Sequence, residues 1–395
     1  MNNTTLYAGG RLFDGAEVHD GQGLLVTDGK IARIADVGEF AGFDGDRVDT
    51  TGGTVLPGLM DCHVHLCYRG EPDPAGALDK LSPAHATMRA FENAQANLRG
   101  GITSVRDCGG KDYLEFAVRD ACNSGRQLGP TIRAAGRMIC MTGGHGNRWG
   151  RVADGCDEVV KAVREQVHAG SDLVKIMATG GVMTPGVDPR DAHYSQEEMT
   201  AGVGEAKRFH KRTASHAQGM QGILHAVRAG IDSIEHGIYM DEQCQREMLE
   251  AGTYLVPTFS ALASILENAD RGIADYVIEK SRMVAERHKE SITAYYKAGG
   301  RIAMGTDAGT PFNMHGANAH ELALMVRFGA MTPKDSIIAA TANAADLIGL
   351  ADRGRLQEGL AADLLVVDGD PLDDVSRVAD RANHRLVVKN GQRVE

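Results

Sequence analysis

The sequence predicts an α/β protein that consists of a (β/α)8 TIM barrel and a small β-sandwich domain. Three observations predict this fold. Short strands rich in β-branched residues alternate with longer helical patterns through the middle of the chain, which favours a parallel sheet with crossover helices. Eight such strands fit into the central part of the 395 residues, within the usual size of a closed barrel. Both ends of the chain instead carry short strands closed by turns.

The two ends have the same character. Residues 1–56 contain Leu-, Val- and Ile-rich pieces separated by turns such as Asp28-Gly29, and residues 354–395 contain the apolar runs 362–368 and 386–391. We expect residues 1–56 and 354–395 to form one composite β-sandwich domain. Residues 57–353 are then left for the barrel.

The barrel strands can be placed in order by the positions at which they end. The eight predicted strands end near His65, Asp107, Ile139, Ala178, His216, His236, Pro257 and Asp307. The last strand is expected over residues 302–306, and a long charged helical stretch over residues 261–297 is expected to form an outer helix pair. An open doubly wound sheet is the competing architecture, but the chain lacks a Gly-rich phosphate turn after its first strand.

Groups that suit a divalent metal ion stand at several of these strand ends. His63 and His65 are two residues apart, so a strand would direct both imidazoles to one side. Taken singly, each such residue is more often a core histidine, a surface lysine or a capping aspartate. The C-terminal strand ends of a barrel converge, so a full circuit of such groups indicates a site. The six candidates are His63, His65, Lys175, His216, His236 and Asp307.

Lys175 differs from the other five because an ammonium group cannot bind a cation. A lysine inside a barrel is costly unless it is modified. Carbon dioxide would convert it to a carbamate, an anionic group that can bridge two divalent ions roughly 3.5–4 Å apart with a hydroxide between them as nucleophile. Nitrogen and carboxylate ligands suit Zn²⁺ first, although manganese, cobalt and iron remain compatible with them.

Two runs of the chain carry a resemblance to a known family. The run 56–65 (LPGLMDCHVH) and the run 359–364 (GLAADL) resemble the amidohydrolase superfamily, and the resemblance covers nearly the whole chain. It implies that His63, His65, Lys175 and Asp307 bind one metal ion and that Lys175, His216 and His236 bind the other. It also implies that Asp307 takes a proton from the bridging water and passes it to the leaving amine.

Two further runs narrow the resemblance. The run 175–183 (KIMATGGVM) and the run 141–146 (MTGGHG) are similar to cytoplasmic prolidases and related metallo-carboxypeptidases, a branch related to an imidazolone-ring opener. The resemblance implies cleavage of Xaa-Pro dipeptides or N-acyl amino acids, and contact of His145 and Tyr239 with the scissile carbonyl or its tetrahedral intermediate. Arg148 and Arg190 lie on loops after strands three and four, but loop arginines are commonly solvated, so neither is assigned to the site.

Other functions remain open at this stage. The same barrel serves hydrolases of non-peptide amides, cyclic amides, carbamates and ureas, and loops choose among these substrates. Single-metal relatives usually lack the lysine and carry a glutamate beyond the strand-five histidine, whereas Lys175 is present and His216 is followed by Ala217-Gln218-Gly219. A non-catalytic binding barrel would be expected to have lost ligands. An enzyme acting on polysaccharides would need paired carboxylates.

Composition restricts the partners. The net charge of −11 argues against nucleic acid or an anionic membrane as a partner, and no run approaches the roughly 20 apolar residues of a membrane span. The start of the sequence shows no export signal, and seven cysteines without paired spacing favour reduced thiols in the cytoplasm. We therefore expect a cytoplasmic enzyme that acts on a small peptide or amide; a homo-oligomer is left open.

Overall fold

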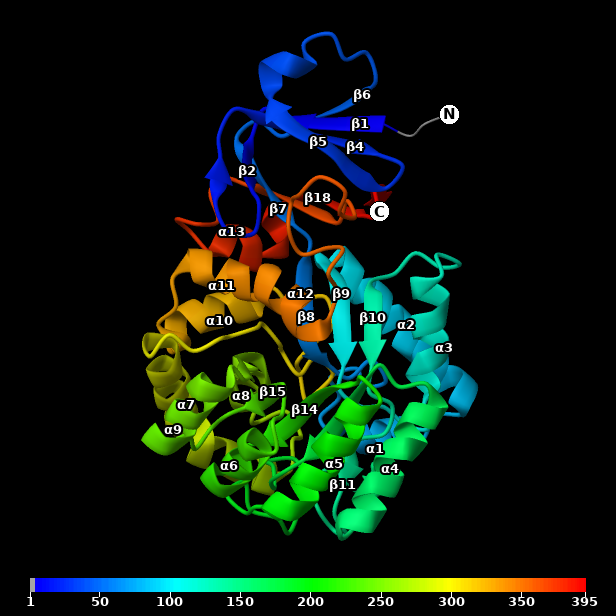
Figure 1. Ribbon diagram of the computed structural model, residues 1–395, viewed down its shortest axis with the longest axis vertical. Helices are drawn as coiled ribbons and strands as arrows, with labels where there is room; N and C mark the ends of the chain where they lie inside the picture. The colour runs from blue at the N-terminus through cyan, green and yellow to red at the C-terminus, as the bar shows by residue number, and fades with distance from the viewer. Residues whose placement is uncertain (1–3) are drawn as a thin grey trace.

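Strands from both ends of the chain meet at one end of the molecule in the computed structural model, which describes residues 4–395 (Figure 1). The N-terminal strands are β1 (Thr4–Ala8), β2 (Arg11–Phe13), β3 (Val18–His19), β4 (Gln22–Thr27), β5 (Lys30–Asp36), β6 (Asp46–Asp49) and β7 (Gly53–Pro57). The C-terminal strands are β17 (Leu364–Asp368), β18 (His384–Lys389) and β19 (Gln392–Val394). One sheet has the order β5-β4-β1-β6 and the other the order β19-β18-β17-β7-β2-β3, so strands from both ends share the second sheet.

Local sequence explains the pairing of β4 with β5. Asp28 and Gly29 form the two-residue turn between them and have φ angles of 50° and 80°. Positive φ at both central residues is what a tight hairpin turn of this type requires, and Asp-Gly adopts it readily. Leu24 of β4 and Val366 of β17, from different sheets, belong to the same buried apolar cluster.

The central strands of the chain are parallel to one another. They are β8 (Leu59–Val64), β9 (Ile102–Asp107), β10 (Thr131–Ala134), β11 (Ile139–Cys140), β12 (Arg151–Val152), β13 (Leu173–Met177), β14 (Arg212–Ala217), β15 (Ser233–His236) and β16 (Tyr254–Val256). They form one sheet of order β10-β9-β8 and another of order β12-β11-β13-β14-β15-β16. The third expected strand, ending near Ile139, is divided into β10 and β11, with Gly136 at φ 76° between them.

The segment after α9 lies between the two central sheets. Ile302 forms an isolated parallel bridge with Leu255 of β16, and Ala308 forms one with Val64 of β8. The segment therefore contacts β16, the end strand of one sheet, and β8, the end strand of the other.

The expectation of a regular strand over residues 302–306 was wrong. The main-chain N–H of Met304 donates to Ala339 O, and that of Thr306 donates to the Asp61 carboxylate at 3.1 Å. Neither of these N–H groups bonds to the main chain of β8. No continuous ladder of hydrogen bonds therefore forms between residues 302–306 and β8. The segment is extended but irregular, and Asp307 stands at its end.

Helices surround the central strands (Figure 1). They are α1 (Pro74–Asp79), α2 (Pro83–Arg99), α3 (Leu114–Asn123), α4 (Cys156–Ala169), α5 (Gln196–Arg208), α6 (Met220–Arg228), α7 (Glu242–Ala251), α8 (Phe259–Glu267), α9 (Asp275–Lys297), α10 (His320–Gly329), α11 (Pro333–Ala339), α12 (Ala342–Ile348) and α13 (Ser376–Ala379), with 3₁₀ turns η1 (Val37–Phe40) and η2 (Arg381–Asn383). The predicted helical stretch 261–297 is the pair α8 and α9. Over residues 4–395, no helix is both long enough and apolar enough to cross a membrane.

Sequence signals set the helix starts and the core beneath them. A capping box of Ser195 and Glu198 begins α5, with each side chain accepting from the other residue's main-chain N–H. The main apolar core lies between the central strands and the helices. Ile176 of β13, Val159 of α4 and Val203 of α5 are fully or almost fully buried in it. The helices thereby fix the strands whose ends carry the candidate ligands.

A buried ionic cluster ties the C-terminal strands β17 and β18 to the segment that precedes them. Asp363 of the GLAADL run accepts hydrogen bonds from Arg353 Nη1 and Lys389 Nζ, both at 2.7 Å, and from the main-chain N–H of Asn390 at 2.8 Å. The side chains of Asp363 and Lys389 are only 1% and 3% exposed. Removing the carboxylate would leave two buried cations without their shared partner.

Asp363→Ala is therefore expected to lower the free energy of unfolding by about 3–5 kcal/mol, the usual cost of breaking a buried ion pair from one side. Urea denaturation followed by circular dichroism measures this change. Asp352→Ala is the matched control, because Asp352 also pairs with Arg353 but its side chain is 63% exposed. We expect about 0–1 kcal/mol for it. If both variants lost a similar amount of free energy of unfolding, burial of Asp363 would not explain its effect on stability.

Candidate metal centre and cavity

The structure brings the six predicted ligands together in one cavity at the C-terminal ends of the central strands. The contributing residues are His63 on β8, His65 just beyond it, Lys175 on β13, His216 on β14, His236 on β15 and Asp307 after the bridging segment. One ligand atom from each of His63, His65 and Asp307 lies within 4.8 Å of the others. The ring centroids of His216 and His236 are 4.6 Å apart, and those of His63 and His236 are 5.3 Å apart.

Hydrogen bonds fix which nitrogen of the first two histidines faces the cavity. His63 Nδ1 lies 2.8 Å from Glu235 Oε2, and His65 Nδ1 lies 2.8 Å from Gly109 O. A carboxylate or carbonyl oxygen can only accept, so each Nδ1 carries a hydrogen, and in the neutral ring the lone pair lies on Nε2. Both Nε2 atoms face Asp307 Oδ1, at 3.6 Å from His63 and 3.1 Å from His65.

The other two histidines are held in the same manner. His216 Nε2 donates to Gly180 O at 2.9 Å, which leaves the Nδ1 lone pair available. His236 Nδ1 lies 2.7 Å from the hydroxyl of Thr258. Each ring therefore has one nitrogen engaged by the protein and one left for a ligand, as metal-binding histidines require.

The electrostatic state of the cavity suits metal binding. Burial lowers the pKa of His63 and of His216 well below the usual value, and it lowers the pKa of His236 to about 3. These imidazoles are neutral, so their lone pairs can bind a cation. Burial alone would raise the pKa of Asp307, but the imidazole rings of His63 and His65 beside it outweigh that effect and hold the pKa well below its usual range.

Two buried atoms at the centre lack hydrogen-bond partners. Lys175 Nζ and Asp307 Oδ1 are both shielded from solvent and form no hydrogen bond. Leaving such groups unsatisfied inside a protein costs about 1–3 kcal/mol or more. Carbamylation of Lys175 and a cation beside Asp307 would satisfy both groups, so the residues present fit a metal centre.

The backbone conformation sets the direction of two of the six candidate ligands. His236 and Asp307 have φ angles of 73° and 61°, in the left-handed region that residues with a Cβ rarely adopt. Such conformations persist where surrounding structure enforces them, and they concentrate at functional sites. Both residues terminate a strand-like segment, and the turn directs their side chains into the cavity.

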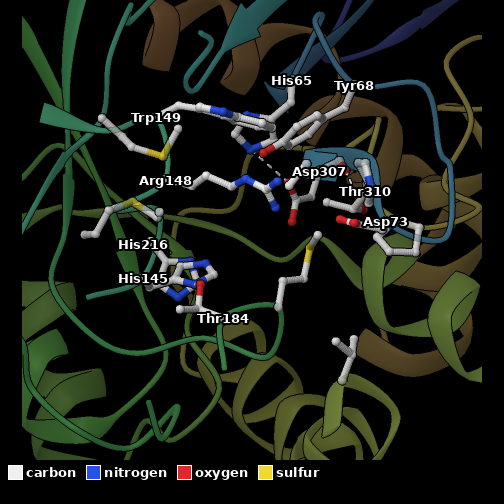
Figure 2. A pocket seen from close by; sticks show the side chains of 18 of the residues that line it. His65, Tyr68, Asp73, His145, Arg148, Trp149, Thr184, His216, Asp307 and Thr310 are labelled. Atoms are coloured by element: carbon white, nitrogen blue, oxygen red, sulfur yellow. Dashed lines mark hydrogen bonds and ion pairs between the residues drawn. The ribbon is translucent and has the colours of Figure 1, made fainter. Parts of the chain in front are cut away.

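The cavity above these residues has a volume of about 580 Å³. Figure 2 shows His65, Tyr68, Trp149 and Arg148 along one part of its wall and His145, His216 and Thr184 along another, with Asp307 between them. The rings of Tyr68 and Trp149 are 5.2 Å apart. An apolar wall beside a polar floor is typical of a site for a small molecule.

The two residues expected to contact substrate differ in placement. His145 lines the cavity, and its ring centroid is 4.3 Å from that of His216. Its Nδ1 lies 2.8 Å from Thr184 Oγ1, and burial lowers its pKa to about 3. Tyr239 follows β15 but is not among the described residues that line the cavity; it packs against the apolar cluster that includes Ile238.

Sequence reasoning left out Arg148, which lines the cavity. Its Nε donates to Asp79 Oδ2 at 2.7 Å, while the indole nitrogen of Trp149 donates to Asp79 Oδ1 at 2.9 Å. Arg190 instead pairs with Asp188 on the surface and does not line the cavity. Both arginines follow a strand, so the sequence held no signal to separate them; only the path of each loop does.

Comparison with known proteins shows relatives that are similar over nearly the whole chain. A sequence model of the amidohydrolase family matches residues 54–394. Ochratoxinase from Aspergillus niger is 32% identical, with 94% of this chain and 82% of that protein covered. The structure of a Xaa-Pro dipeptidase with methionine bound in its active site is 33% identical, with a TM-score of 0.91 over 99% of this chain and 100% of that one. A prolidase in complex with N-methylphosphonate-L-proline is 29% identical, with a TM-score of 0.89 and 99% of each chain covered.

Proposed function

The chain belongs to the amidohydrolase family, with its TIM-barrel fold and with prolidase-like relatives, and from this premise we propose that it hydrolyses Xaa-Pro dipeptides or N-acyl amino acids. The observation that carries the proposal is the convergence of four histidines, Asp307 and the unpartnered Lys175 Nζ at the floor of a cavity of about 580 Å³. The likeness to a Xaa-Pro dipeptidase over the full length of both chains supports the substrate class.

The proposed centre holds two divalent ions, most simply Zn²⁺. We assign His63, His65, Asp307 and a carbamate on Lys175 to one ion, and the same carbamate with His216 and His236 to the other. Bound there, the ions would polarise the scissile carbonyl and acidify water. The proposal extends to the architecture: a closed eight-stranded barrel over residues 57–353, and a β-sandwich of residues 1–56 and 354–395, of which residues 1–3 lie outside the described part of the chain.

The chain's own residues supply proton transfer and stabilisation of negative charge. Asp307, with an oxygen free of hydrogen bonds, is placed to accept a proton and return it to the leaving amine. The Thr184 hydroxyl can donate to His145 Nδ1, which leaves the Nε2–H of this neutral ring to donate to a developing oxyanion. Tyr239 receives no role in this scheme because it does not line the cavity.

Release of free amino acids from a defined panel tests the function. Protein loaded with Zn²⁺ and bicarbonate is incubated with Xaa-Pro dipeptides, other dipeptides and N-acyl amino acids, and matched cyclic amides, carbamates and ureas. We expect a C-terminal amino acid to be released. Protein that holds two ions and cleaves only the non-peptide substrates would show that the substrate class is wrong while the metal centre is right.

Arg148 is the cavity-lining cation outside the proposed metal ligands and can pair with a substrate carboxylate. Arg148→Met is expected to raise KM for substrates with a free carboxylate by about 10- to 100-fold, since a hydrogen bond to a charged group contributes about 1.5–3 kcal/mol. Asp79 keeps its bonds to Trp149 and Lys111 in this variant. Steady-state kinetics measure the effect.

Two controls accompany this measurement. Substrates amidated at the C-terminus should lose little with Arg148→Met, and Arg190→Met should leave KM unchanged because Arg190 pairs with Asp188 outside the cavity. An equal loss with free and amidated substrates would show that Arg148 acts on the loop and not on the carboxylate.

A further inference from the structure

A buried ionic pair lies directly beneath the candidate metal centre. Glu235, on β15, is fully buried, and Arg106, on β9, is 1% exposed. Arg106 Nη2 donates to Glu235 Oε1 at 2.7 Å, and the Ser233 hydroxyl donates to the same oxygen at 2.5 Å. The other oxygen, Oε2, accepts from His63 Nδ1 at 2.8 Å. Arg106 Nε also donates to Cys62 O at 2.5 Å, on the strand that carries His63.

We propose that Glu235, held by Arg106, is a positioning residue that fixes His63 in the orientation and tautomer needed to bind a divalent ion. This inference rests on the proposed function, because it takes His63 as a metal ligand. As an acceptor with no hydrogen to give, the carboxylate keeps the hydrogen of His63 on Nδ1 and the lone pair on Nε2, toward Asp307. Arg106 in turn prevents the carboxylate from rotating, since its bonds to Cys62 O and Glu235 tie β9 to both β8 and β15.

The backbone of β15 lets two consecutive residues serve one centre. Adjacent residues on a strand normally point to opposite faces. Ser233 and Glu235 face the barrel interior together, so His236 should point away. Its φ of 73° breaks the alternation, and its ring centroid lies 5.3 Å from that of His63. Glu235 and His236 thus both contact His63 from the end of a single strand.

The same atoms are poorly suited to binding a separate ion. One ligand atom each of His63, Cys108 and Glu235 lies within 4.8 Å of the others, which resembles a metal site. Both oxygens of Glu235 already accept hydrogen bonds from Arg106, Ser233 and His63. Burial raises the pKa of the Cys108 thiol to about 12, so it stays protonated. The cluster therefore acts on His63 and not on a further cation.

The cost of burying the Arg106–Glu235 pair also favours a positioning role over a purely stabilising one. Removing two charges from water is costly, and buried ion pairs can often be replaced by apolar residues of similar volume without loss of stability. An ion pair at this place is therefore not explained by stability alone. The hydrogen bond to His63 is the contact that an apolar replacement would lose.

Glu235→Gln tests the proposal, because the amide keeps the shape of the side chain but loses its charge. If its oxygen remains toward His63, its NH₂ group faces Arg106; if it flips, it favours the tautomer with the hydrogen on His63 Nε2. We expect the affinity for Zn²⁺ to fall by about 10- to 100-fold. Competition with a chromophoric chelator measures this affinity, and the visible absorption spectrum of the Co²⁺-loaded protein reports the ligand geometry.

A second variant covers the case in which Glu235→Gln does not fold. Arg106→Met combined with Glu235→Met replaces the ion pair by apolar side chains and removes the acceptor for His63. We expect this protein to fold and to show the same loss of Zn²⁺ affinity. Ser171→Ala is the control, because Ser171 is a buried serine that donates to Ala135 O and forms no hydrogen bond with Glu235 or with a proposed metal ligand. Its Zn²⁺ affinity and Co²⁺ spectrum should be unchanged.

The outcomes distinguish this inference from the proposed function. A folded Glu235 variant with native Zn²⁺ affinity and a native Co²⁺ spectrum overturns the positioning role. A native protein that binds no divalent ion overturns the metal centre and this inference with it. If peptides are not cleaved but the affinity falls as expected, the positioning role stands and only the substrate class is wrong.

Discussion

In the variant Lys175→Met, amide hydrolysis is expected to fall by at least about 10²–10³-fold, the usual cost of removing one preorganised charge-stabilising group. The metal-free protein should nevertheless be as stable as the native one or more stable. Lys175 is 1% exposed and its Nζ has no hydrogen-bond partner, so methionine removes an unsatisfied buried group without creating a cavity. Loss of activity together with retained stability is the signature of a functional lysine.

Three measurements resolve this prediction. Metal analysis should show that the number of bound ions falls below two, and isotope-labelled bicarbonate should give a carbamate signal in the native protein that is absent from the variant. Thermal unfolding without metal gives the stability. Lys161→Met is the control, because Lys161 lies exposed on α4 and should change none of these properties. A folded Lys175→Met protein with two bound ions would contradict the bridging role.

The spatial convergence of the candidate ligands could be read from sequence because it follows from topology. His63, His216 and His236 each lie at the last or next-to-last position of a strand that pairs in parallel, so their side chains had to meet at one end of the strands. Asp307 lies beside the other candidates even though its strand is irregular, since Ala308 next to it still bridges to Val64 of β8. The predicted convergence of the candidate ligands therefore depends on the order of the strands along the chain more than on the regularity of each strand.

Details that depend on single dihedral angles or on loop paths could not be predicted. Glu235 precedes a predicted ligand, and alternation along a strand assigns the two residues to opposite faces. The φ of His236, which no sequence pattern reveals, places both against His63. Likewise, the loop that directs Arg148 into the cavity is held by Asp79, about seventy residues earlier in the chain.

Asp307→Asn is expected to lower kcat for amide substrates by about 10²–10⁴-fold at saturating metal, the range for loss of a general acid–base group. The amide has nearly the same shape as the carboxylate, so the fold should be unaffected. It cannot accept and return a proton. The neutral amide is also a weaker metal ligand than the carboxylate, so Zn²⁺ should bind more weakly.

The leaving group separates the proton-transfer role of Asp307 from its role as a ligand. An amide must receive a proton at nitrogen to depart, whereas an activated ester of the same acyl group departs without one. With metal saturating, Asp307→Asn should therefore impair amide hydrolysis much more than ester hydrolysis. Asp73→Asn is the control, because Asp73 lines the same cavity but caps α1 by accepting from the Gly76 N–H, which asparagine does equally well. Equal losses on amide and ester would assign Asp307 to metal binding alone and require another proton donor in the cavity.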